Sequence, residues 1–150
     1  MTVAIRGDAA EVALGEAQAV LGHVLDPERR GRLADLIAAV QEGELDDDAA
    51  QALGELVELG LASGRIRSVY GPEGEQAALK TYRRLPGGRA LAESAAEVSE
   101  ALAALAGRVL ETVKVQSTGP GAFLVTLGVD GLELSVRLDA AGARIHSVGV

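Results

Sequence analysis

Residues 123–138 read FLVTLGVDGLELSVRL, and this stretch decides the fold class of the C-terminal part of the chain. Large apolar residues occupy every second position from Phe123 to Leu127 and again from Leu132 to Leu138. Side chains two residues apart share one face of a β-strand. Asp130-Gly131 lies between the two runs and favours a tight primed turn, because Gly tolerates positive φ. The stretch therefore predicts a β-hairpin with one buried face.

The same alternation continues on both sides of this hairpin. Val113 and Val115 alternate with polar residues before a turn at residues 119–121, and a turn at residues 139–142 leads into the last strand, residues 143–150. Four strands in this order predict an antiparallel meander. A long helix is expected before it, over residues 88–107, with an apolar stripe. The stripe consists of Leu91, Ala95, Val98, Leu102 and Leu105.

The N-terminal part reads as three helices over residues 9–25, 27–42 and 47–60. Asp26-Pro27 is a typical helix start, with Asp as the N-cap and Pro at the first helical position. The acidic run Asp46–Asp48 predicts the start of the next helix, where carboxylates bind free backbone N–H groups. After it, residues 65–70 and 79–84 are expected to form a second, shorter hairpin about a turn at residues 71–75.

These elements together predict an α+β protein. An N-terminal helical bundle with a winged-helix-like hairpin is expected over residues 1–87. A long helix packed on a C-terminal antiparallel meander sheet is expected over residues 88–150.

Residues 56–93 resemble the C-terminal half of a winged helix-turn-helix domain, as found in bacterial regulators of the multiple-antibiotic-resistance and phenolic-acid-decarboxylase types. The segments that carry the resemblance are Leu56-Val57-Glu58-Leu59-Gly60-Leu61, then the two short strands expected at residues 65–70 and 79–84, then Pro86-Gly87-Gly88-Arg89-Ala90-Leu91. The resemblance implies a winged-helix module over about residues 27–93. It also implies that the helix over residues 47–60 holds the position of the DNA-recognition helix.

The charges disfavour ordinary DNA recognition by that helix. The chain has a net charge of −8, and residues 1–64 carry 13 acidic and four basic side chains. The helix over residues 47–60 has no Arg or Lys, although a helix in the major groove normally brings basic and amide groups to phosphates and bases. Acidic groups there oppose the counterion release that drives binding. We therefore expect no nucleic-acid partner.

No motif in the sequence predicts catalysis, a cofactor or a metal site. The chain has no Cys, and its two His residues, His23 and His146, are far apart and outside any metal-binding or catalytic motif. The glycine-rich pieces match no phosphate-binding loop. We expect no catalytic residue and lean against an enzyme. The composition and the lack of a long apolar run indicate a cytoplasmic protein without a membrane partner.

The most informative feature is a bipolar charge layout. The acidic face of the helix over residues 47–60 is followed in the sequence by the basic residues of segments 65–70 and 79–84. Surfaces of opposite charge orient two proteins as they associate. The leading hypothesis is a non-enzymatic interaction or assembly module that forms homo-oligomers and whose association slows with added salt. One alternative is a winged-helix regulator that binds DNA through a basic wing, and another is a small-ligand binder or enzyme with a pocket between helix 88–107 and the sheet. The candidate interaction residues are Gln51, Glu55, Glu58, Arg65, Arg67, Lys80, Arg83 and Arg84.

Overall fold

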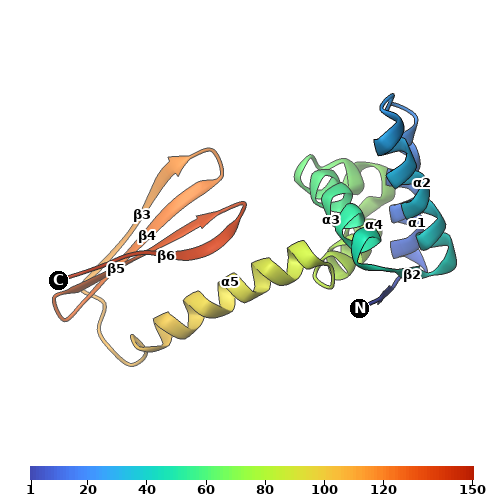
Figure 1. The fold of residues 1–150 in the computed structure, drawn as a ribbon. Coiled ribbons are helices and arrows are strands. Elements are labelled where there is room, and N and C mark those ends of the chain that lie inside the picture. Colours follow the sequence, from blue (N-terminus) through green and yellow to red (C-terminus); the bar gives the residue numbers. More distant parts are fainter. The chain divides into compact units, whose positions relative to one another are not determined.

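The computed structural model describes all 150 residues and divides them into two compact units, Met1–Arg89 and Ala90–Val150. Unit 1 contains the helices α1 to α4, and unit 2 contains most of helix α5 and a four-stranded antiparallel sheet (Figure 1). The helices come first and the sheet forms the C-terminal end. The chain is therefore an α+β protein, which confirms the predicted fold class.

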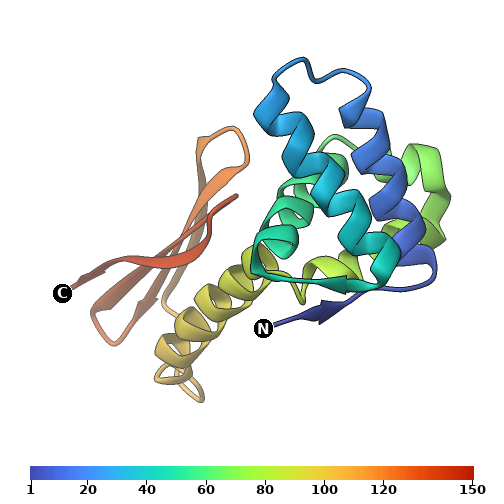
Figure 2. The same cartoon turned by 45° about the vertical axis from the view of Figure 1, so that its right-hand side comes forward.

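Unit 1 is a helical bundle with a small two-stranded sheet. Its helices are α1 (Asp8–Leu21), α2 (Pro27–Glu42), α3 (Asp47–Ala62) and α4 (Arg65–Tyr82). Strand β1 (Val3–Ala4) pairs antiparallel with strand β2 (Glu44–Leu45), which joins α2 to α3. Helices α1 and α2 run side by side in Figure 2, and β1 crosses below their ends.

Two of the helix starts follow directly from the sequence. The side chain of Asp26 accepts a hydrogen bond from the backbone N–H of Arg29 at 3.1 Å, and Pro27 opens α2. The side chain of Asp46 accepts one from the backbone N–H of Ala49 at 2.8 Å. Each bond satisfies one of the free N–H groups that a helix start leaves. Both predicted caps are confirmed.

The core of unit 1 combines a few large side chains with many small ones. Leu36, Leu45, Leu53, Ile66 and Leu85 are almost completely buried. Small residues let the helices approach closely around them. At Gly60 of α3, for example, an added Cβ would lie 2.7 Å from the Cδ1 atom of Ile66 in α4. The bundle therefore depends on close helix contacts rather than on aromatic side chains.

The hairpin predicted over residues 65–84 is wrong, because these residues form α4 and the turn directly after it. Buried positions after the break at Gly71 recur at a spacing of three to four residues, which is the period of a helix face, and Ile66 is buried before it. The positions after the break are Gly74, Ala78 and Thr81. The expected turn is a break within the helix, where Gly71 takes φ 73° and Pro72 resumes the helical path. The hairpin wing that the winged-helix resemblance implies is thus replaced by a helix.

Unit 2 contains the predicted meander. Strands β3 (Thr112–Gly119), β4 (Ala122–Val129), β5 (Leu132–Asp139) and β6 (Gly142–Gly149) follow each other in the sheet in chain order. Asp130 and Gly131 both take positive φ, 52° and 77°, so the primed turn is confirmed. The register pairs the alternating apolar residues of β4 with those of β5, which gives the sheet one apolar face and one polar face.

Helix α5 (Pro86–Ala103) links the two units and ends four residues before the predicted boundary. In unit 2 its buried side chain is Val98, which is 7% exposed. Ser94, one turn earlier, accepts a hydrogen bond through Oγ from the backbone N–H of Ala143 at 3.3 Å. Helix α5 therefore contacts the sheet at its β6 side.

Candidate functional site

The acidic helix face predicted from the sequence is an exposed row on α3. Gln51, Glu55 and Glu58 are all exposed, at the i, i+4 and i+7 positions of one helix face. The amide of Gln51 donates a hydrogen bond to Glu55 at 3.2 Å, and the hydroxyl of Tyr82 donates one to Glu58 at 3.3 Å. Partial burial of Tyr82 and the nearby Glu58 carboxylate raise the pKa of the Tyr82 hydroxyl.

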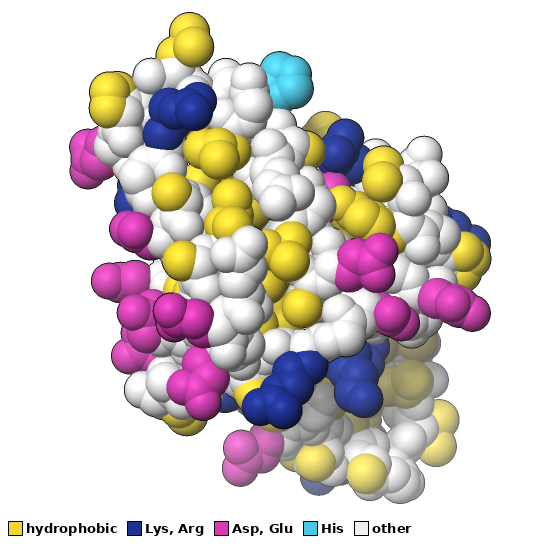
Figure 3. Space-filling view, turned by 90° about the vertical axis from the view of Figure 1, so that its right-hand side faces the viewer, with side chains coloured by type: hydrophobic (Ala, Val, Ile, Leu, Met, Phe, Trp, Pro, Cys, Tyr) yellow, Lys and Arg dark blue, Asp and Glu magenta, His cyan; other side chains and the backbone are white.

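A groove of about 530 Å³ lies beside this row, between α2 and α3. Its wall carries Gln51 and Glu55 together with Asp35, Asp46 and Asp48, and Arg32 is its one basic residue. On the face drawn in Figure 3, most acidic side chains lie along the left and right sides, and basic side chains lie near the top, at the right and below the centre. The negative charge of α3 thus extends onto the neighbouring helix α2.

Arg65 and Arg67 do not form the free basic face that a strand would have given them. Arg65 lies in the first turn of α4, and its Nε donates to both carboxylate oxygens of Glu16 in α1, at 3.1 and 3.2 Å. Arg67 donates to Glu75 of its own helix at 3.2 Å. Both cations therefore have partners within the chain, and neither partner belongs to the acidic row of α3.

The pair formed by Arg65 and Glu16 holds a carboxylate inside the core. Glu16 is 3% exposed, and Tyr70 of α4 lies nearby. Burial, followed by the negative charge of Glu16, raises the pKa of the Tyr70 hydroxyl. The arrangement joins α1 to α4 through charge as well as packing.

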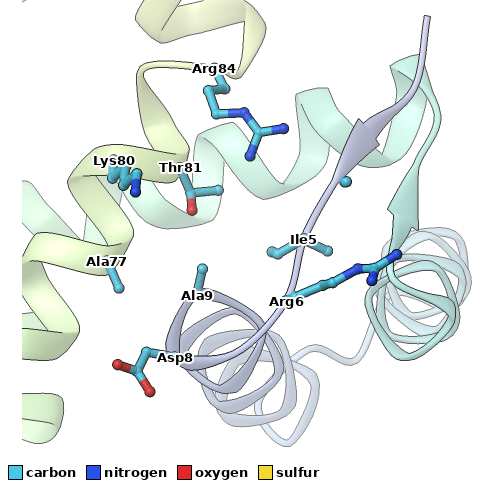
Figure 4. Close-up of a pocket in the computed structure, with 9 residues that line it drawn as sticks. Ile5, Arg6, Asp8, Ala9, Ala77, Lys80, Thr81 and Arg84 are labelled. Carbon is cyan, nitrogen blue, oxygen red and sulfur yellow. The ribbon is translucent and has the colours of Figure 1, made fainter.

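Lys80, Arg83 and Arg84 lie at the other end of α4, and none of them forms an ion pair. Arg83 is exposed. Lys80 and Arg84 line a cavity of about 340 Å³ between this end of α4, strand β1 and the start of α1 (Figure 4). The eight predicted residues are therefore divided among three places: the acidic row of α3, the first turns of α4, and its C-terminal end.

A feature that the sequence prediction missed lies on the sheet of unit 2. Three side chains of its apolar face, Val129, Leu134 and Val136, are buried, whereas other large side chains of the same face are exposed. Seven large apolar side chains are exposed on this face. They are Val113, Val115, Phe123, Leu132, Leu138, Ile145 and Val148. The alternation in the sequence showed that these residues share a face, but it could not show that the single helix α5 covers only part of the sheet.

The two histidines lie near the end of a helix and on an edge strand. The Nδ1 atom of His23 lies 2.9 Å from the carbonyl oxygen of Ala19 near the end of α1. His146 lies on the exposed strand β6. No group of three His, Cys, Asp or Glu side chains is arranged to bind a metal ion. None of the helices has the length and apolar character that crossing a bilayer requires.

No protein family, curated protein or solved structure matches this chain. The surfaces of the chain that can bind a partner or ligand are the acidic row of α3, the basic cavity at the end of α4 and the apolar face of the sheet.

Proposed function

We propose that this protein is a non-enzymatic assembly module that pairs with a second copy of itself. The pairing joins the β3 edge of one sheet to the β3 edge of the other. The observation that supports this proposal most is the exposed apolar face of unit 2. Apolar patches of roughly 300–600 Å² are the largest that a typical monomer exposes, and they commonly mark interaction sites.

The β3 edge is the open side of this sheet. Every residue from Thr112 to Thr118 is exposed, and the pairing with β4 is regular from Thr112 to Ser117. The strand contains no Pro, and Lys114 is its one charged residue. An edge of this kind leaves a row of backbone N–H and C=O groups free to pair with another strand.

The β6 edge is protected by comparison. Its register with β5 shifts in the middle of the strand, between Ser135 and Val136, whereas the shift in β3 lies at the end of that strand, between Ser117 and Gly119. An irregularity in mid-strand bends the strand away from regular pairing. The backbone N–H of Ala143 is already bound to Ser94 of α5. A second sheet therefore meets fewer obstacles at β3.

The β3 sequence suits antiparallel pairing with itself about Val115. This register places Val115 opposite its own copy, Val113 opposite the second copy's Ser117, and Lys114 opposite the second copy's Gln116. No like charges then face each other across the strands, which would destabilise the pair. The two apolar faces then lie side by side in one eight-stranded face, and the apolar side chains of the two β3 strands contact each other across the junction.

The acidic row of α3 favours this proposal over DNA recognition. Gln51, Glu55 and Glu58 occupy the exposed surface of the helix that the winged-helix resemblance places in the DNA groove. Carboxylates there repel phosphates, and the hairpin that would carry a basic wing is a helix in this protein.

The test compares two matched variants, Val115→Lys and Val148→Lys. Both valines lie on the apolar face, at 63% and 62% exposure, but on opposite edge strands. We expect a wild-type dimer by sedimentation velocity. The Val115→Lys variant places two ammonium groups side by side at the junction and should be monomeric, whereas Val148→Lys should remain a dimer.

Circular dichroism checks that both variants fold, which their exposure allows. A wild-type protein that stays monomeric at high concentration contradicts the proposal. So does a dimer that survives Val115→Lys, or one that Val148→Lys disrupts equally, because either result moves the interface away from β3.

A further inference from the structure

We infer that the cavity at the end of α4 is a binding site for a small phosphate monoester. The cavity has a volume of about 340 Å³ and lies wholly within unit 1. Its walls come from three segments far apart in the sequence: β1 with the residues after it, the first turn of α1, and the last turn of α4 with Arg84 (Figure 4).

Three basic side chains line this cavity without ionic partners. Lys80 lies in the last turn of α4, Arg84 follows that helix, and Arg6 follows β1 on the opposite wall. None of them forms a salt bridge, although the chain as a whole is acidic and pairs Arg65, Arg67, Arg108, Arg137 and Arg144 with carboxylates. Lys80 and Arg84 bring unpaired positive charge to the α4 side of the cavity, whereas in Figure 4 the guanidinium of Arg6 points away from them. Unpaired positive charge beside a cavity points to an anionic ligand.

The hydroxyl of a largely buried threonine lies at the same space. Thr81 is 7% exposed, and its hydroxyl, which takes part in none of the side-chain hydrogen bonds of unit 1, is not sealed from solvent. In Figure 4 the Thr81 oxygen is directed from α4 toward Ala9 in the first turn of α1, and the guanidinium of Arg84 lies on the same side of α4. A hydroxyl placed in this way can donate to a phosphate oxygen, while the guanidinium can bind two such oxygens.

The start of α1 adds backbone donors. Gly7, at the N-cap, takes φ 60° and provides no side chain to cap the helix. The N–H groups of the first turn therefore have no side-chain acceptor, and they carry the positive end of the helix dipole. Asp8 is the one acidic residue on the wall, and in Figure 4 its carboxylate points away from Thr81 and Arg84.

The remaining lining indicates a small organic ester rather than a nucleic-acid strand. Ala4, Ile5, Ala9 and Ala77 provide apolar wall beside the charged groups. Ligand sites commonly begin at roughly 300 Å³ and combine apolar walls with a few placed polar groups. A cavity of this size accepts a terminal phosphate with a few attached carbon atoms.

The experiment titrates the full-length, ¹⁵N-labelled protein with inorganic phosphate and with methyl phosphate, at constant ionic strength. We expect saturable amide shifts confined to residues 5–10 and 77–85. The Arg84→Gln variant should weaken binding about tenfold or more, because it removes a charge-assisted contact. Thr81→Val, which keeps the side-chain shape, should weaken it by a smaller factor.

Arg83→Gln is the matched control, since Arg83 is the neighbouring exposed cation and does not line the cavity. It should leave the affinity unchanged. Absence of saturable shifts overturns the proposal, as does equal weakening by Arg83→Gln and Arg84→Gln. A third arm uses a short DNA duplex, and duplex binding that depends on Arg84 without saturable binding of either small phosphate also overturns it.

Discussion

At the scale of single residues, Glu16 is the group that ties the bundle together electrostatically. It is the one buried acidic side chain of the chain, and Arg65 binds both of its oxygens. A buried carboxylate is costly unless it is paired and hydrogen-bonded. Arg65 therefore stabilises unit 1 by compensating a buried charge, rather than by offering a surface to a partner as the alternation of residues 65–70 predicts.

This difference predicts unequal costs for two arginines close together in α4. Arg65→Ala leaves Glu16 buried without its cation, and we expect a loss of roughly 1–3 kcal/mol, reduced from the fully buried case because water reaches half of the Arg65 side chain. Arg67→Ala breaks a pair in which the arginine is mostly exposed and should cost less than about 1 kcal/mol. Urea unfolding followed by circular dichroism measures both, and equal losses would contradict this role of Glu16.

At the scale of elements, the sequence predicts what local chemistry determines. The N-caps Asp26 and Asp46 and the turn at Asp130-Gly131 depend on residues within a few positions of each other, and all three are present. Helix α4 could not be predicted in this way. The six residues from Arg65 to Tyr70 alternate as in a strand, but the burial of Gly74, Ala78 and Thr81 follows a helical period that only packing against α1 and α3 imposes.

The candidate sites likewise differ in whether local sequence spacing or the packing of distant segments creates them. The exposed acidic row of α3 follows from helical spacing, so the sequence was sufficient to find it. The cavity beside Lys80 and Arg84 depends on β1 and α1 reaching the end of α4, which no local pattern reveals. The exposed apolar face of the sheet depends on how much of it α5 covers, which is also a property of the folded unit.

Close packing of α3 on α4 makes a second prediction, with two glycines as a matched pair. Gly60→Ala adds a Cβ that would meet the buried Ile66, so we expect a loss of about 1–3 kcal/mol despite the better helix propensity of Ala. Gly31→Ala, within α2, adds a Cβ with nothing within 4 Å and should gain about 0.5–1 kcal/mol. Thermal unfolding of the two variants decides the matter, and a stabilised Gly60→Ala variant would show that the two helices lie farther apart.

At the scale of the whole molecule, the net negative charge of the chain opposes the association that the exposed apolar face of the sheet favours. The chain has a net charge of −8, and both units contribute to it, since residues 1–89 carry 15 acidic and ten basic side chains and residues 90–150 carry seven and four. Two copies therefore repel each other at long range. The proposed interface at β3 carries one charged side chain, Lys114, and two large apolar ones, Val113 and Val115. Its affinity therefore comes from strand pairing and apolar contact rather than from complementary charge.

The proposed dimer and the proposed anion site therefore respond to salt in opposite directions. Raising NaCl from about 20 mM to about 500 mM shortens the screening length severalfold, which removes the repulsion between two acidic chains and should tighten the dimer by a few fold. The same change should weaken methyl phosphate binding, because salt screens the attraction of Lys80 and Arg84 for the phosphate. Sedimentation equilibrium and the amide titration, each repeated across the salt series, measure the two trends. A dimer that weakens with salt would instead assign association to charged contacts, with the acidic row of α3 as the surface to mutate next.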